Sequence, residues 1–199
     1  MSVTDIALAT IQAEHRALSA VLHTFQELLG KVEAGYGAPD FGLFSAMLYY
    51  IDDFQERCHH PKEEKYIFDS LRAATPEFDG VISELQAEHV KGAQAVSRLH
   101  RCLVFYQGGM PGGIGMLKAG VDDYIARMHE HMRCEEALFE RSRAVIVEHD
   151  WARIAAAFDE NDDPLFGSNR RQAFGQLYQR ILVLAPHKLK QGMSPASRF

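Results

Sequence analysis

Residues 117–145 read LKAGVDDYIARMHEHMRCEEALFERSRAV. Apolar residues return at every third or fourth position of this stretch, a spacing that places them on one face of an α-helix. His131 and Glu135 hold positions in the same series, four residues apart, so both side chains project from that face one turn apart. The full series is Leu117, Val121, Tyr124, Met128, His131, Glu135, Leu138, Ser142 and Val145. The stretch therefore predicts a helix over residues 113–148 whose inner face offers an imidazole and a carboxylate.

Two further segments carry a single histidine in the same kind of apolar series. Residues 4–34 place His15 in one series, and residues 76–106 place His89 in another, with Thr75 as the expected N-cap and Pro76 at the first helical position. The first series is Leu8, Ile11, His15, Leu18, Leu22, Phe25 and Leu29, and the second is Phe78, Ile82, Leu85, His89, Gly92, Val96, Leu99 and Leu103. Both segments therefore predict amphipathic helices with an inward histidine.

The segment over residues 40–73 is less regular, because CHHPKEEK separates its apolar start from its apolar end. Pro61 lacks a backbone donor and crowds the preceding turn, so we expect a kink that changes which face points inward. Two pairs have the four-residue spacing of a shared helix face: His59 with Glu63, and His60 with Glu64. The spacing alone leaves both pairs open as the inward one.

Glycine and proline breakers at residues 35–39, 75–76 and 108–113 separate the four segments. Long amphipathic helices with short connections favour an all-α fold, an up-down-up-down antiparallel four-helix bundle over residues 1–149. Residues 150–185 predict a helical extension packed on the bundle, with a helix from Asn169 to Leu184, and residues 186–199 predict a tail. The acidic run DENDD at 159–163 lacks the glycine and final glutamate of an EF-hand, so we expect a solvated turn rather than a calcium site.

The polar members of these series are expected at one level of the bundle. Counted from the approximate helix ends, all six lie roughly 15–25 Å from the same end at about 1.5 Å per residue. The six are His15, His59, Glu63, His89, His131 and Glu135. Such groups buried without partners would cost several kcal/mol per charge, comparable with the whole stability of a domain at about 5–15 kcal/mol. Four imidazoles and two carboxylates exceed the needs of tetrahedral zinc and suit two iron or manganese ions.

Composition excludes several classes of partner. The net charge of −6 offers no basic surface for nucleic acid or an anionic membrane, and no apolar stretch approaches the length of a membrane span. The three cysteines, Cys58, Cys102 and Cys134, form neither a disulfide framework nor a CxxC motif, which favours a cytoplasmic location. The other histidines are expected to be surface or packing residues: His23, His100, His129, His149 and His187.

Four separated motifs in order resemble the hemerythrin-like family of HHE cation-binding domains. They are EHRAL at 14–18, HHPKEEKYIF at 59–68, EH at 88–89 and HMRCEEALF at 131–139. The resemblance spans residues 10–145 and favours His59 and Glu63 as ligands, with His60 as a possible additional one. It implies two iron ions with an oxo or hydroxo bridge, with manganese or zinc as alternatives. Oxygen-carrying hemerythrins have a second histidine four residues after the first in helix three, where this chain has Ala93.

The function implied is binding of dioxygen or nitric oxide at a di-iron centre, for sensing, detoxification or iron handling rather than bulk oxygen transport. Glu63 and Glu135 are expected to bridge the ions, with His15 and His59 on one side and His89 and His131 on the other. One alternative is an enzyme-like turnover of peroxide or nitric oxide, or the repair of iron-sulfur centres. A second alternative is a metal-free helical interaction domain that buries its histidines in hydrogen-bond networks.

Overall fold

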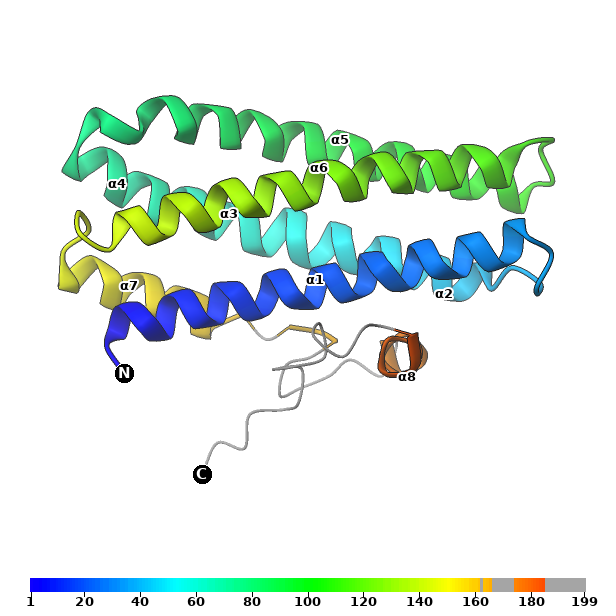
Figure 1. Ribbon diagram of the computed structural model, residues 1–199, viewed down its shortest axis with the longest axis horizontal. Helices are drawn as coiled ribbons and strands as arrows, with labels where there is room; N and C mark the ends of the chain where they lie inside the picture. Colours follow the sequence, from blue (N-terminus) through cyan, green and yellow to red (C-terminus); the bar gives the residue numbers. More distant parts are fainter. Residues whose placement is uncertain (162, 166–173, 185–199) are drawn as a thin grey trace.

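The computed structural model describes residues 1–161, 163–165 and 174–184, and within them the chain is helical and contains no β-strand. The all-α class predicted from the sequence is therefore confirmed. Four helical rods lie side by side: α1 (Val3–Glu33), a segmented rod from Phe41 to Ala74, α5 (Asp79–Gln107) and α6 (Gly113–Ser142). Figure 1 shows the α1–α2 and α5–α6 connections at one end of these rods and the α4–α5 and α6–α7 connections at the other.

The second rod changes its helical type along its length. It consists of α2 (Phe41–Tyr50), the π-helix η1 (Ile51–His59), α3 (His60–Lys62), the π-helix η2 (Glu63–Phe68) and α4 (Asp69–Ala74). The irregularity predicted at Pro61 thus takes the form of π-helical segments on both sides. The His60 N–H donates to the Gln55 carbonyl five residues back, so each turn is wider than an α-turn. Because the turns are wider, neighbouring residues such as His59 and His60 can both point inward.

Local signals explain where the other rods begin and end. Ser2 forms a capping box with Asp5 at the start of α1. Thr75 accepts a hydrogen bond from the Glu77 N–H and opens the 3₁₀ turn η3 (Pro76–Phe78) that leads into α5, as predicted. The helix predicted to reach residue 148 instead ends at Ser142, whose carbonyl accepts the N–H groups of both Val145 and Ile146. This turn redirects the chain so that the next helix packs back on α1.

Two shorter helices cover the bundle. Helix α7 (Glu148–Asp159) packs on α1 and η2 with Trp151, Ile154 and Phe158 buried, and α8 (Gly175–Leu184) packs on α1 and α2. The predicted start of the last helix, at residue 169, and the predicted tail at 186–199 lie outside the described residues. The expectation of a solvated acidic turn at 159–163 is wrong for two of its residues, which face the bundle instead: Asn161 donates to Glu14, and Asp163 accepts from Tyr50.

The core is divided into two apolar clusters by a polar layer. On α1, Ile11 belongs to one cluster and Leu18 to the other, with His15 between them. On α5, Leu85 and Ala95 take the same two sides of His89. The periodicity read from the sequence is therefore confirmed, and its polar members form a level of their own. In the described part of the chain, no helix combines the length and apolar composition needed to cross a membrane.

Candidate metal centre

All seven residues that the sequence singled out lie in the polar layer and are buried. Their relative exposures are His15 3%, His59 0%, His60 3%, Glu63 0%, His89 6%, His131 3% and Glu135 0%. Each of the four rods contributes at least one of them. The other described histidines, His23, His100, His129 and His149, do not join the cluster, and His187 lies outside the described residues.

Glu63 lies at the middle of the cluster, where its two oxygens face different imidazoles. Its Oε1 lies 3.0 Å from His59 Nε2 and 3.7 Å from His15 Nε2, while its Oε2 lies 3.7 Å from His89 Nε2. Two groups of potential ligand atoms therefore share this carboxylate. They are His15, His59 and Glu63 in one group, and His60, Glu63, His89 and His131 in the other.

Glu135 approaches both groups from α6. Its Oε1 lies 2.9 Å from His131 Nε2 and 3.4 Å from His89 Nε2, and its Oε2 lies 3.5 Å from His15 Nε2. The cluster therefore has two carboxylates at its centre and imidazoles on either side. This arrangement places Nε2 atoms and carboxylate oxygens around two neighbouring points, a donor set suited to metal ions.

Several atoms at the centre of the cluster accept no hydrogen bond although they are buried. Both oxygens of Glu63, Oε2 of Glu135 and Nε2 of His131 have no hydrogen-bond partner. Buried polar groups are ordinarily hydrogen-bonded, and an unpaired buried charge costs several kcal/mol. Because these atoms face one another, a cation among them would satisfy them together. The residues therefore fit a bound metal.

A second layer of carboxylates holds the outer nitrogens of His59, His89 and His131, and sequence reasoning missed this role. The Glu14 carboxylate bonds His59 Nδ1 at 2.5 Å, Glu64 bonds His89 Nδ1 at 2.8 Å, and Glu88 bonds His131 Nδ1 at 2.8 Å. Outer carboxylates of this kind fix the tautomer and orientation of metal-binding histidines, leaving Nε2 free for the metal. The donor set therefore comes with the support that ligating histidines require.

These outer carboxylates form a ring around the bundle. Glu14 on α1 serves the second rod, Glu64 on the second rod serves α5, and Glu88 on α5 serves α6. Glu136 on α6 takes the fourth position of the ring, but its Oε1 lies 3.8 Å from His15 Nδ1 on α1, beyond hydrogen-bond distance. Each ring member directly precedes or follows an inner residue of its own rod. That adjacency, as in Glu14 before His15, is a signal that the sequence contains.

His60 has a different environment from the other four imidazoles. Its Nδ1 lies 3.1 Å from a Glu56 oxygen, and its Nε2 lies 2.9 Å from the Gln55 side-chain amide. It stacks on His89 with ring centroids 4.0 Å apart. Glu56 reaches this position beside Gly92, where an added Cβ would lie 3.1 Å from its carboxylate oxygen. The inward-facing position of α5 at Gly92 thus lacks a side chain, and the Glu56 side chain of the second rod occupies that space.

The structure distinguishes the two pairs that spacing left open. Glu63 is fully buried among the imidazoles, whereas the side chain of Glu64 is 37% exposed and bonds His89 from outside. His59 and Glu63 are therefore the inward pair, with His60 beside them. The thiol of Cys58, next to His59 in the sequence, donates to the Asn161 side-chain oxygen at 3.1 Å.

Charged neighbours shift the pKa values of His131 and Glu63 against the direction that burial favours. Burial alone would lower the pKa of His131, but the neighbouring Glu135 carboxylate outweighs it and raises that pKa from 6.5 to about 9. Burial would raise the pKa of Glu63, yet the positive charge of His59 holds it well below its ordinary value. For His60, burial and the charge of His89 act together and keep its pKa well below 6.5. Protons on the imidazoles thus supply the positive charge that a metal would supply.

Comparison with known proteins identifies the family of the chain. The model of the hemerythrin HHE cation-binding domain matches residues 7–141, which include all seven cluster residues. Searches among curated proteins and among solved structures gave no match. The match covers well over half of the chain and extends from the second turn of α1 to Arg141 near the end of α6. The chain therefore belongs to the hemerythrin HHE cation-binding family.

Proposed function

We propose that this protein is a non-haem di-iron protein that binds dioxygen or nitric oxide, and that it serves sensing, detoxification or iron handling. The observation that carries the proposal is the pair of buried carboxylates that face imidazoles on both sides, with three of their four oxygens accepting no hydrogen bond. Two ions sharing Glu63 and Glu135 would occupy this arrangement. Carboxylate-bridged pairs with imidazole ligands suit iron or manganese better than zinc.

The proposed partition of ligands follows the two groups of donor atoms. His15 and His59 would hold one ion, while His89 and His131 would hold the other. His60 would be an additional ligand of the second ion only after its Nε2 leaves the Gln55 amide. The scaffold would be an antiparallel up-down four-helix bundle over residues 1–149, with residues 150–185 as an extension packed on it.

Ligand binding rather than stable oxygen carriage is favoured by the third rod. Ala93, at the position where oxygen-carrying hemerythrins have a second histidine, is exposed, and the inner face carries Gly92 instead. Fewer protein ligands leave more coordination positions for water or a small molecule. The metal, once bound, would supply Lewis acidity and one-electron chemistry. The residues of the chain would orient it, exclude bulk water and hold the outer protons at the imidazole Nδ1 atoms.

Anaerobic reconstitution of the full chain with ferrous iron tests the proposal. We expect about two iron ions per chain and an absorption change on exposure to dioxygen or nitric oxide. The variant His131→Ala should lose at least one ion, while His129→Ala should retain both, because His129 is exposed and outside the cluster. One iron or none in the unmodified protein, without an absorption change, would contradict the proposal.

An enzyme-like turnover of peroxide or nitric oxide is the second candidate. It is favoured by a pocket that opens beside His60 and His131, because turnover requires a path for substrate and product. Steady consumption of peroxide or nitric oxide by the reconstituted protein would distinguish turnover from binding. A metal-free interaction domain is disfavoured by the unbonded oxygens of Glu63.

A further inference from the structure

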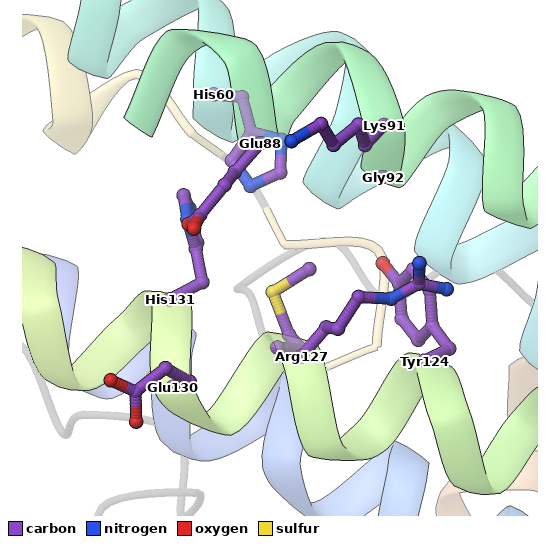
Figure 2. Close-up of a pocket in the computed structure, with 9 residues that line it drawn as sticks. His60, Glu88, Lys91, Gly92, Tyr124, Arg127, Glu130 and His131 are labelled. Atoms are coloured by element: carbon purple, nitrogen blue, oxygen red, sulfur yellow. The ribbon is translucent and has the colours of Figure 1, made fainter. Parts of the chain in front are cut away.

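A pocket lies between α5 and α6 at the edge of the polar layer. Its volume is about 160 Å³, and His60 and His131 form part of its wall. Figure 2 shows these two histidines at one end of the pocket and Tyr124 toward the other, with Lys91 entering from α5 and Arg127 from α6. The remaining lining residues are Glu88, Gly92, Met128 and Glu130. The pocket therefore connects the surface with one side of the cluster.

The volume exceeds the needs of a diatomic ligand. An enclosed apolar cavity of about 150 Å³ accepts a molecule of the size of benzene. Dioxygen or nitric oxide would leave most of the present pocket to water. Gly92 and the buried Met128 form part of the pocket wall. The pocket is thus large enough for a small organic molecule.

The charges around the pocket indicate which charge a bound molecule should carry. Within the described residues, Lys91 forms no ion pair, and Arg127 pairs only with the exposed Asp123 at 2.5 Å. The acidic lining residues are already engaged: Glu88 bonds His131 Nδ1, and Glu130 pairs with Arg133. In the described part of the chain, Lys91 is therefore the lining residue whose charge is not paired, whereas Arg127, Glu88 and Glu130 each have a charged or hydrogen-bonding partner.

The walls are otherwise apolar. The Tyr124 ring is buried and its hydroxyl is used by Glu56, to which it donates at 3.0 Å. Met128 contributes a flexible thioether side chain, a type that adapts to ligands of different shape. A ligand that matches these walls has an apolar body of six or so carbon atoms and one anionic group.

We propose that this pocket binds a small organic monocarboxylate of about the size of benzoate. The carboxylate group lies at the opening near Lys91 and Arg127, and the apolar body lies against Met128 and the Tyr124 ring. Its consequence for the metal rests on the proposed function, since an occupied pocket would limit access to the ion beside His131. The binding itself requires no metal.

Titration of the full chain with benzoate and with its neutral analogue benzamide tests the proposal. The protein carries ¹³C-methyl methionine and is measured by NMR and calorimetry, both metal-free and loaded with diamagnetic Zn²⁺. We expect saturable benzoate binding at least about fivefold tighter than benzamide binding, since the two differ mainly in charge. The Met128 methyl signal should shift more than those of the other six methionines.

Variants at the opening test the role of charge. Lys91→Gln and Arg127→Gln should each weaken benzoate binding about threefold, and Lys91→Glu about tenfold, with benzamide binding unchanged. Lys118→Gln is the matched control, because it removes the same charge from α6 at a residue that pairs with Asp122 and does not line the pocket. Its benzoate affinity should equal that of the unmodified protein.

Two results would overturn the proposal: no saturable benzoate binding, or binding that is equal for benzamide, for Lys91→Glu and for the control. Failure of the proposed function is a separate outcome. A protein that binds benzoate in the pocket but retains no iron would contradict the di-iron proposal alone. A protein that retains two irons but binds no benzoate would contradict the pocket proposal alone.

Discussion

The two halves of the cluster have similar donor atoms but differ in what packs against their outer sides. The half formed by His15 and His59 lies beneath α7: the Phe158 ring packs edge-on against His59 with centroids 5.8 Å apart, and Asn161 donates to Glu14. The Lys62 ammonium also donates to the Ala157 carbonyl at 2.6 Å, which holds α7 to the second rod. This half is closed by protein on its outer side.

The half formed by His89 and His131 adjoins the pocket between α5 and α6 instead. Its outer carboxylates Glu88 and Glu64 are 45% and 37% exposed, whereas in the other half Glu14 is 7% exposed and Glu136, near His15, is 51% exposed. The pocket therefore indicates that external molecules reach the cluster from this side. A centre built from nearly equivalent histidines thus becomes asymmetric through what lies outside them.

Removing the shared Glu63 carboxylate should have the largest effect on iron content, because both halves of the cluster use it. Glu63→Gln keeps the size of the side chain but removes the charge and one acceptor oxygen from both groups. We expect iron content to fall from about two ions per chain to one or none, a loss of roughly 10³-fold or more in affinity at about 1.4 kcal/mol per factor of ten.

Glu64→Gln is the matched control for this substitution. Its carboxylate bonds only the outer nitrogen of His89, and its side chain is 37% exposed. Metal analysis of both variants after identical reconstitution measures the effect. If Glu63→Gln retained two ions as firmly as Glu64→Gln does, the shared carboxylate would have no bridging role.

The stability of the metal-free protein should fall as the pH rises. The pKa of His131 is about 9 in the folded chain, above the 6.5 of an unperturbed histidine. The folded state therefore holds a proton that the unfolded state has lost, so this stabilisation is complete below pH 6.5 and disappears as the pH passes 9. A shift of this size corresponds to about 3 kcal/mol.

Denaturant unfolding between pH 6.5 and 9 measures this dependence. His131→Asn should reduce it while His129→Asn should not, and the rest should persist because the pKa values of His15, His59 and His89 are raised as well. Metal binding requires loss of the same proton, so the affinity for iron should rise over that range. A metal-free protein that becomes more stable with increasing pH would show that Glu135 does not hold a proton on His131.

Substitutions of the outer carboxylates should lower metal affinity by smaller amounts that differ between the two halves. Glu14→Gln weakens support for His59 in the closed half, and Glu88→Gln does the same for His131 in the open half. Loss of such a partner typically costs 10–100-fold in metal affinity. We expect the Glu14 variant near the upper end, because its bond is short and buried, and the Glu88 variant near about tenfold, because water can replace an exposed carboxylate.

Titration of each metal-loaded variant with a competing chelator measures two successive steps, one for the affinity of each ion. Each variant should weaken one step and leave the other nearly unchanged. Glu84→Gln on α5, which is exposed and outside the ring, provides the control. Equal losses at both steps in both variants would indicate that the ring acts as one unit rather than in separate halves.

Periodicity was enough to predict the inner residues of three rods. His15, His89 and His131 replace apolar residues in regular α-helical series, so the face they occupy follows from spacing alone. The second rod could not be treated in this way. Its π-helical turns beside Pro61 bring both His59 and His60 inward, and no α-helical period describes that arrangement.

The partners of the outer carboxylates could not be predicted from the sequence for a different reason, although the adjacency of each carboxylate to an inner residue can be read from it. Glu14, Glu64 and Glu88 occupy positions that look solvent-facing on their own helices, and their partners are defined only once the neighbouring rod is placed. Asn161 is an extreme case, since it contacts Glu14 across 147 residues of sequence from within an acidic run. Such roles depend on packing, which helical spacing does not encode.

Tyr124→Phe should have the smallest effect, and it should be confined to the open half. The phenol donates to Glu56, whose carboxyl holds His60, and burial raises the pKa of that carboxyl to about 7. Removing the hydroxyl leaves one oxygen of Glu56 without its donor and costs about 1 kcal/mol of unfolding free energy. Iron content should remain unchanged, since no inner ligand loses its partner.

Tyr106→Phe serves as the control for this change, because Tyr106 packs edge-on against Phe41 at the far end of α5. If Tyr124→Phe reduced metal affinity as strongly as Glu88→Gln does, the link from Tyr124 through Glu56 to His60 would reach the metal, and His60 would act as a ligand of the open half. If stability alone changes, His60 supports the pocket wall and the other four histidines suffice for the two ions. The asymmetry between the halves would then arise from their surroundings and not from the number of imidazoles.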